Sequence, residues 1–193
     1  LSKMKPEGRK VYTGSNGYQR YDGPDVSPMP IPGSPGSYVA NASEHDAMGD
    51  TTHLPSRHVQ MTERRFAKLR LLEDGTYESL HSQEPIVVMP WGGSKGSTQE
   101  AYTILLEQGV KLGWCYTMYL HPLPAKLFEE LRQKELVIVP ELNYLGQFSS
   151  YLRSLGVKAE SITQYTGLPF KVQDLVTRVK SQIHYRKEVP VGS

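Results

Sequence analysis

Hydrophobic positions follow two different patterns along the chain, and the second pattern begins near residue 76. In the second part, short apolar runs alternate with segments whose apolar residues recur every three or four positions. Short apolar runs predict buried strands, and the longer period predicts amphipathic helices. The runs are PIVVMPW (85–91), LGWCYTMYL (112–120), LVIVPEL (136–142) and, more weakly, AESITQY (159–165).

The segments between these runs carry signals for helix starts and ends. Ser97 and Glu100 have the spacing of a capping box, and Gly109 follows the last apolar position of that helix. Pro124 is expected to begin the next helix, and the last helix has its apolar positions within 172–183. Near-continuous apolar strands alternating with helices predict a three-layer α/β/α domain with a mostly parallel sheet.

In such a fold the strand-to-helix loops meet at the carboxyl edge of the sheet, where ligands or partners bind. The loops expected there are PWGGSKGS (90–97), HPLP (121–124), ELNYLGQ (141–147) and YTGLP (165–169). We therefore expect any functional site of this domain at that edge.

The first part of the chain follows no regular period and is rich in turn-forming residues. Between Gly23 and Gly36 there are five prolines and three glycines, which predicts an extended, turning arm or linker over residues 1–60. Apolar residues near helical spacing predict a connecting helix over 61–75. The α/β domain is expected over 76–188, followed by a tail at 189–193.

Length, charge and cysteine content narrow the classes of function. A chain of 193 residues with 38% hydrophobic residues can bury one sizeable core, and a net charge of +2 gives no strong field for nucleic acid. No apolar run is long enough to cross a bilayer, and the start LSKMKPEGRK lacks the apolar segment of a secretory signal, so a cytoplasmic chain is expected. The single cysteine, Cys115, excludes an internal disulfide and a cysteine-based metal site.

The glycine-rich turn after the first run is the strongest candidate for phosphate binding. A Walker loop needs its lysine after the second glycine, but Lys95 precedes Gly96, and the adjacent Gly92 and Gly93 also fail the dinucleotide pattern. Backbone amides at a helix start can still hold an anion. A stand-alone anion- or nucleotide-binding module built on Trp91 to Ser97 is therefore the alternative to a plain turn or contact surface.

A second candidate is the tripeptide Glu44, His45 and Asp46, which offers an imidazole between carboxylates. Such a set suits a metal or acid/base site, and a small hydrolase using His45 and Asp46 is a third hypothesis. No HExxH spacing accompanies it, so a surface turn with hydrogen-bonded side chains is favoured. The last helix is basic, which is typical of a solvated face, although an acidic electron carrier would fit it.

Five strings occur in an order that resembles a known family. They are VSPMPIPGSPGSYVANASEHDAMGDTT (26–52), MTERRFAKL (61–69), VVMPWGGSKGSTQEA (87–101), HPLP (121–124) and VIVPELNYLGQF (137–148). Together they resemble the C-terminal part of the alpha subunit of 2-oxoacid:ferredoxin oxidoreductases, especially the 2-oxoglutarate type. The resemblance covers residues 18–186.

The resemblance implies a domain similar to the C-terminal domain of transketolase, with five strands and one antiparallel edge strand. TYESLH (76–81) is the candidate for that edge strand. The family decarboxylates a 2-oxoacid oxidatively on thiamine diphosphate with Mg, passes the acyl group to coenzyme A and sends electrons through an iron-sulfur cluster to ferredoxin. Its thiamine lies between the pyrimidine-binding domain of the alpha subunit and the beta subunit.

The resemblance places the catalytic carboxylate and the substrate-gripping residues upstream of this chain, so no catalytic residue is assigned here. Leu1 in place of an initiator methionine fits an internal fragment. The leading hypothesis is a structural and assembly domain that is inactive alone and binds no cofactor by itself. The residues expected to face a ligand, a neighbouring domain or a subunit are Trp91, Gly92, Gly93, Lys95, Gly96, His121, Asn143, Tyr144, Gly146 and Gln147, together with Glu44, His45 and Asp46.

Overall fold

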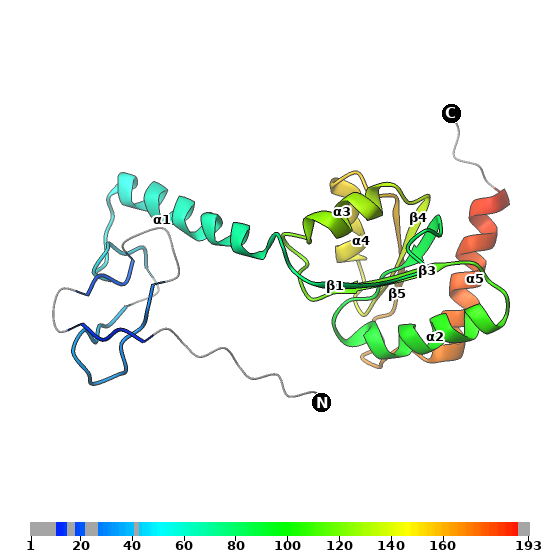
Figure 1. Cartoon of the computed structure of the whole chain (residues 1–193), viewed down its shortest axis with the longest axis horizontal. Helices are drawn as coiled ribbons and strands as arrows, with labels where there is room; N and C mark the ends of the chain where they lie inside the picture. Colours follow the sequence, from blue (N-terminus) through cyan, green and yellow to red (C-terminus); the bar gives the residue numbers. More distant parts are fainter. Residues whose placement is uncertain (1–10, 15–17, 22–26, 41–42, 189–193) are drawn as a thin grey trace. The chain divides into compact units, whose positions relative to one another are not determined.

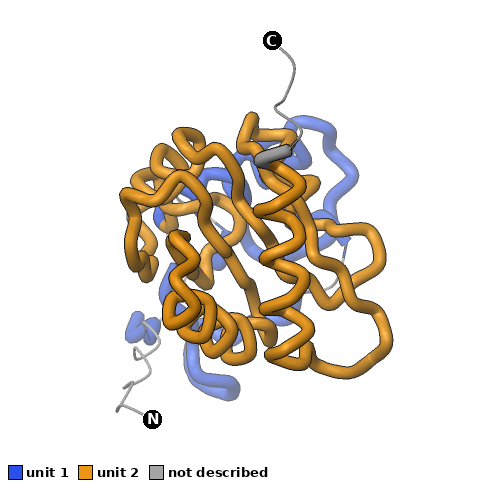
Figure 2. The backbone as a smooth tube through the Cα atoms, turned by 90° about the vertical axis from the view of Figure 1, so that its right-hand side faces the viewer, with its two compact units in different colours: residues 1–71 blue, residues 72–193 orange. Residues whose placement is uncertain are grey.

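Figure 1 shows the computed structural model of the chain, which describes residues 11–14, 18–21, 27–40 and 43–188. The chain divides into two compact units, residues 1–71 and 72–193, coloured separately in Figure 2. The tail expected at 189–193 and the first ten residues of the expected arm lie outside the described part.

The first unit contains one long helix, α1, over Pro55–Ala67, followed by a 3-10 helix, η1, over Lys68–Leu72. Proline stands at the first helical position, where its fixed φ suits the helix and no N–H is needed. The helix therefore begins six residues before the expected start at Met61. Met61 itself is buried within the helix.

The described part of the Pro/Gly-rich segment turns instead of running straight. The N–H of Ser34 donates to the carbonyl of Ile31 at 2.9 Å, and the N–H of Ser37 donates to that of Ser34 at 3.1 Å. Gly33 and Gly36 have φ of 83° and 86°, a region that glycine occupies without strain. The turns expected in this segment therefore occur within residues 31–37, where two glycines allow successive reversals.

The second unit contains a five-stranded sheet in the order β1-β3-β2-β4-β5. The strands are β1 Tyr77–Leu80, β2 Ile86–Val88, β3 Gly113–Thr117, β4 Leu136–Glu141 and β5 Ala159–Thr163. β1 runs antiparallel to β3 at one edge, and all other neighbouring pairs are parallel. The expected mostly parallel sheet with an antiparallel edge strand at 76–81 is confirmed.

Four helices cover the sheet on both faces: α2 Lys95–Glu107, α3 Ala125–Arg132, α4 Gln147–Ser154 and α5 Val172–Glu188. α2 and α5 pack on one face, and α3 and α4 pack on the other (Figure 1). Alternate strand residues feed the two cores, so Val88 and Ile138 face α2 and α5, while Val87 and Val139 face the other layer. The expected three-layer α/β/α fold is confirmed.

The predicted start of α2 is wrong by three residues, since the expected N-cap is Ser97 and the observed N-cap is Ser94. A one-turn 3-10 helix, η2, over Gly92–Ser94 leads directly into α2 at Lys95, so the N-cap is Ser94 and the capping box of Ser97 with Glu100 does not form there. The hydroxyl of Ser97 instead lies 3.4 Å from the carbonyl of Ser94. Pro124, by contrast, is the N-cap of α3, as expected.

Candidate functional site

The carboxyl ends of β2, β3, β4 and β5 lie at one edge of the sheet, beside the start of the antiparallel β1. The four loops expected there all leave from this edge. They carry Trp91, Gly92, Gly93, His121, Asn143, Tyr144 and Gly146, while Lys95, Gly96 and Gln147 lie in the first turns of α2 and α4. The structure therefore brings this candidate set to one edge and leaves Glu44, His45 and Asp46 in the other unit.

The turn between β2 and α2 is closed by a buried serine that the sequence pattern did not single out. The hydroxyl of Ser94 accepts the Trp91 N–H at 3.2 Å and lies 2.8 Å from the Trp91 carbonyl. It also lies 3.2 Å from the carbonyl of Pro140 in β4, so it ties the turn to the neighbouring strand. The indole of Trp91 packs against Phe148, with ring centroids 6.0 Å apart. These contacts within the domain fix the shape of the turn.

The glycines of this turn have open space beside them, and the lysine of the turn is paired within the domain. A Cβ built on Gly92, Gly93 or Gly96 would meet nothing within 4 Å, so these positions open outward. The side chain of Lys95 extends to neighbouring strands. Its Nζ lies 2.5 Å from Glu78 Oε1 and 4.2 Å from the centroid of the Tyr116 ring. The cation is therefore paired with a carboxylate and an aromatic face on β1 and β3.

The turn between β4 and α4 is organised by a fully buried carboxylate. Glu141 accepts the N–H groups of Phe148 and Ser149 at 2.8 and 2.9 Å, and the side-chain amide of Asn143 donates to it at 3.0 Å. Amide donors at the start of a helix would otherwise lack partners. Asn143 completes the cap, since its Oδ1 accepts the N–H of Gly146 at 2.7 Å and that of Gln147 at 3.2 Å.

Glycine is required at position 146. Its φ is +63°, and an added Cβ would lie 2.8 Å from Ser161 Oγ and 3.0 Å from Ser149 Oγ. Both the backbone conformation and the close approach exclude a side chain. Asn143 and Gly146 are thus explained by the structure of the loop, whereas the side chains of Tyr144 and Gln147 are exposed to solvent.

The solvent side of this edge carries large apolar side chains. Tyr144 and Tyr165 are 69% and 66% exposed, and their rings meet edge to face with centroids 4.9 Å apart. Leu145 and Leu168 are 71% and 66% exposed. We call the exposed set from these two loops the carboxyl-edge patch: Leu142, Tyr144, Leu145, Tyr165 and Leu168. Of these residues, the sequence analysis singled out only Tyr144.

The β3–α3 loop contributes His121, whose ring also has an internal partner. Its Nδ1 lies 2.7 Å from the hydroxyl of Tyr151 in α4, and the two rings meet edge to face. Burial raises the pKa of Tyr151, so at neutral pH the phenol is protonated and is available as a donor to His121. The contact links the β3–α3 loop to helix α4 and forms no dyad with a carboxylate.

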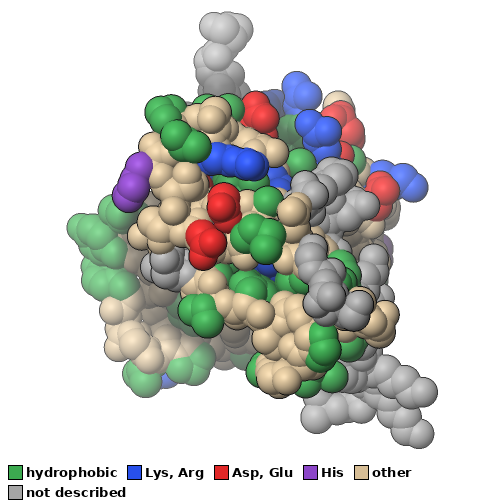
Figure 3. All heavy atoms as spheres, turned by 90° about the vertical axis from the view of Figure 1, so that its left-hand side faces the viewer, with side chains coloured by type: hydrophobic (Ala, Val, Ile, Leu, Met, Phe, Trp, Pro, Cys, Tyr) green, Lys and Arg blue, Asp and Glu red, His purple; other side chains and the backbone are tan. Residues whose placement is uncertain are grey.

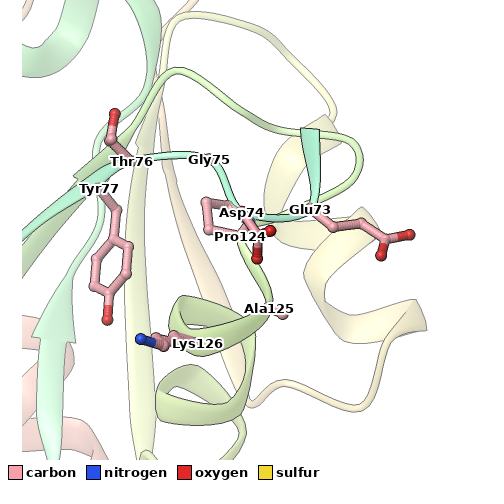
Figure 4. Close-up of a pocket in the computed structure, with 8 residues that line it drawn as sticks. All are labelled: Glu73, Asp74, Gly75, Thr76, Tyr77, Pro124, Ala125 and Lys126. Carbon is pink, nitrogen blue, oxygen red and sulfur yellow. The ribbon is translucent and has the colours of Figure 1, made fainter. Parts of the chain in front are cut away.

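A hollow of about 470 Å³ lies beside the start of β1 and is drawn in Figure 4. Lys126 and Tyr77 lie next to each other there, while the carboxylate of Glu73 points away (Figure 4). The Tyr77 hydroxyl donates to Glu130 at 2.6 Å, and this hydrogen bond raises the pKa of Tyr77 to about 12. Tyr77 is therefore protonated at neutral pH and is not a base.

Glu44, His45 and Asp46 in the first unit each have a different partner. Arg65 donates two hydrogen bonds to Glu44, at 2.9 and 3.1 Å, and this contact lowers the pKa of Glu44 to about 2. His45 stacks on Tyr21 with centroids 3.7 Å apart, and Asp46 accepts backbone N–H groups of the following turn. Figure 3 shows acidic and basic side chains side by side on one face of the molecule. The geometry supports the favoured surface turn.

The described residues offer no complete catalytic set at either place. They contain no group of three His, Cys, Asp or Glu side chains that could hold a metal ion. Cys115 is buried mid-strand, and burial raises the pKa of its thiol, so it is a poor nucleophile. In the same described ranges, no helix combines the length and apolar character needed to cross a membrane.

Comparison with known proteins gives relatives of one kind. No family model matches the chain. It is 32% identical over 154 residues to the 2-oxoglutarate oxidoreductase subunit KorA of Mycobacterium tuberculosis, a match that covers 75% of this chain and 23% of that protein. It is 30% identical over 190 residues to 2-oxoacid:ferredoxin oxidoreductase 2, subunit alpha, of Aeropyrum pernix, covering 91% of this chain and 29% of the relative.

A solved structure agrees. The chain superimposes with a TM-score of 0.75 and 32% identity on the 2-oxoglutarate:ferredoxin oxidoreductase of Magnetococcus marinus, which was solved with 2-oxoglutarate, coenzyme A and succinyl-CoA bound. The match covers 91% of this chain and 32% of that chain. The present chain thus spans about a quarter to a third of the length of these proteins. It belongs, as a part-length relative, to the family of 2-oxoacid:ferredoxin oxidoreductase alpha subunits.

Proposed function

We propose that the chain is a structural and assembly part of a thiamine diphosphate-dependent 2-oxoacid:ferredoxin oxidoreductase and is not catalytic alone. The complete enzyme would convert 2-oxoglutarate, or a similar 2-oxoacid, to the acyl-CoA and pass electrons to ferredoxin. The partners of the chain are then the rest of the alpha subunit, or a separate upstream subunit, and the beta subunit. We place this complex in the cytoplasm.

One observation carries the proposal: nearly the whole chain matches one third of a 2-oxoglutarate:ferredoxin oxidoreductase chain in sequence and fold. The polar side chains at the ligand-binding edge agree with a non-catalytic role. Glu141 and Asn143 are used to cap α4, Lys95 is paired with Glu78, and His121 is held by Tyr151. None of them forms the hydrogen-bonded pair of nucleophile and base that catalysis requires.

The described residues do not fit the cofactors of such an enzyme. Magnesium bound to a diphosphate needs oxygen ligands that face the ligand, whereas the buried carboxylate of Glu141 already accepts three N–H donors. An iron-sulfur cluster is held by several thiolates, and the chain has one cysteine, which is buried. Thiamine diphosphate, magnesium and the cluster would be held by other parts of the enzyme.

Calorimetry and turnover test this proposal together. Titration of the chain with thiamine diphosphate and Mg²⁺ should give no binding heat, and the chain alone should not consume 2-oxoglutarate. Co-expression with the remaining alpha region and the beta subunit should give a complex that oxidises 2-oxoglutarate and reduces ferredoxin. Turnover by the chain alone, or failure of the chain to join that complex, would contradict the proposal.

The alternative, an anion-binding module on Trp91 to Ser97, makes a different prediction. It requires saturable shifts of the amide resonances of Gly92, Gly93 and Gly96 when phosphate, coenzyme A or a nucleotide is added. Because the only lysine of this turn is paired with Glu78, we expect no saturable shift. A Glu78→Gln variant, which frees Lys95, is the control for a masked site.

A further inference from the structure

We propose that the carboxyl-edge patch is the docking surface for a folded domain of the same oxidoreductase that lies outside this chain. This inference rests on the proposed function and deepens it by assigning the contact surface. The patch consists of Leu142, Tyr144 and Leu145 from the β4–α4 loop and Tyr165 and Leu168 from the β5–α5 loop. Because β4 and β5 are neighbouring parallel strands, both loops leave the sheet side by side.

The composition of the two loops is that of the centre of a protein interface. The segments 142–147 (LNYLGQ) and 164–169 (QYTGLP) contain no charged residue, although 22% of the chain is charged. Interface centres are depleted in charge and enriched in tyrosine. Two leucines and two tyrosines, each about two thirds exposed or more, form a larger apolar surface than scattered single residues.

The patch is also held in a fixed shape before any partner binds. Gly146 and the cap made by Glu141 and Asn143 fix the first loop. The side-chain amide of Gln164 donates to the carbonyls of Leu168 and Pro169, at 2.7 and 3.0 Å, and fixes the second. The ring contact of Tyr144 with Tyr165 joins the two. A preorganised aromatic surface loses little conformational entropy on binding.

The size of the relatives identifies the occupant. The solved 2-oxoglutarate:ferredoxin oxidoreductase chain is about three times as long as its matched part, and the relatives from Mycobacterium tuberculosis and Aeropyrum pernix are longer still in proportion. A domain of this fold in such an enzyme therefore has further folded structure of the same protein beside it. An uncharged, apolar and aromatic patch fits a folded protein surface that is itself apolar and offers carbonyl acceptors to the two tyrosine hydroxyls.

The experiment measures binding of this chain to a probe. The probe is the remaining alpha region together with the beta subunit, supplied by co-expression. A Tyr144→Ser/Tyr165→Ser double variant should weaken binding of the chain to this probe roughly tenfold or more, because both rings leave the interface centre. Tyr185→Ser is the matched control, since Tyr185 is 62% exposed on α5 and should leave binding unchanged. Leu168→Glu, which places a charge in the patch through a single exposed residue, is a second variant if the double variant fails to fold.

Each outcome decides one of the two proposals. Loss of binding in the patch variants, with normal binding of Tyr185→Ser, supports the docking surface. Normal binding of all variants would overturn it while leaving the proposed function standing. A wild-type chain that does not bind the probe at all would overturn both. Wild-type self-association in analytical ultracentrifugation that the double variant abolishes would show that a second copy is the occupant, and this would also overturn the proposal.

Discussion

The two edges of the sheet in the second unit differ sharply in chemistry, although the same strands and helices build both. The carboxyl edge has two loop segments, 142–147 and 164–169, that contain no charged residue and carry exposed tyrosine and leucine. The amino edge has a hollow of about 670 Å³ whose lining includes Glu84, Lys111, Glu135, Lys180 and Arg186. Mixed exposed charges are typical of a solvated surface, and uncharged aromatic loops are typical of a contact.

This difference shows that topology alone does not assign roles to the edges of an α/β sheet. Topology places ligands at the carboxyl edge, but the polar groups found there point inward to caps and neighbouring strands. The large hydrophobic side chains of the β4–α4 and β5–α5 loops remain exposed. This edge therefore combines an internal polar framework with an external apolar patch, and different substitutions affect the two.

The largest effect is expected when the buried carboxylate of Glu141 is removed. Glu141→Ala leaves the amides of Phe148 and Ser149 without an acceptor and should lower the free energy of unfolding by roughly 3 kcal/mol. Glu135→Ala, at the exposed amino edge, is the control and should change it by less than about 0.5 kcal/mol. Urea denaturation measures both. Equal effects of the two variants would mean that Glu141 does not organise the loop.

A smaller effect is expected from alanine at two glycines with positive φ. In Gly146→Ala the new Cβ would clash with Ser161 and the backbone would be strained, so the free energy of unfolding should fall by roughly 2 kcal/mol or more. In Gly109→Ala, near the amino edge, the new Cβ would enter open space at a φ of +76°. Backbone strain alone should then lower the free energy of unfolding by about 1 kcal/mol. Thermal or urea denaturation compares the pair. A larger loss at Gly109 than at Gly146 would contradict the close approach at the carboxyl edge.

The smallest effect is expected for the titration of the Tyr77 hydroxyl at alkaline pH. The hydrogen bond to Glu130 raises the pKa of Tyr77 to about 12, whereas a free tyrosine has a pKa of about 10. Between these values the folded chain keeps a proton that the unfolded chain has lost, so the free energy of unfolding falls as pH rises through this window.

The titration can be followed by the ultraviolet absorbance of the tyrosine phenolates. The difference between the wild type and Tyr77→Phe gives the titration of Tyr77 alone. Glu130→Gln should move the pKa of Tyr77 down toward 10 and reduce the alkaline loss of stability. An unchanged titration in Glu130→Gln would show that the hydroxyl is not bound to Glu130 in solution.

Most of the fold follows from the sequence because strand and helix periods are local signals. The four apolar runs became β2 to β5, and TYESLH became the antiparallel edge strand. The start of α2 was misplaced, since the signal from Ser97 and Glu100 competes with a 3-10 turn that Ser94 closes through a contact with Pro140. That contact joins residues 46 positions apart, so no local pattern reveals it.

The sequence predicts where in the fold most of the candidate residues lie, but it predicts few of their contacts. The carboxyl edge follows from topology, and Asn143, Gly146 and Gln147 do lie there. The partner of Lys95 is Glu78, on a strand that reaches it only through the antiparallel pairing of β1 with β3. The sequence does indicate a role for Glu141, because an acidic residue at the end of an apolar strand and shortly before a helix can accept the N–H groups of that helix. The meeting of Tyr144 with Tyr165 needs the folded structure.

Hydrogen–deuterium exchange on the chain, alone and within the complete alpha and beta assembly, compares the two edges of the sheet in one experiment. Peptides covering 142–147 and 164–169 should gain protection in the assembly, while peptides covering the amino edge at 109–111 and 180–186 should not. Protection confined to the amino edge, with unchanged exchange at both carboxyl-edge loops, would contradict docking through the carboxyl-edge patch.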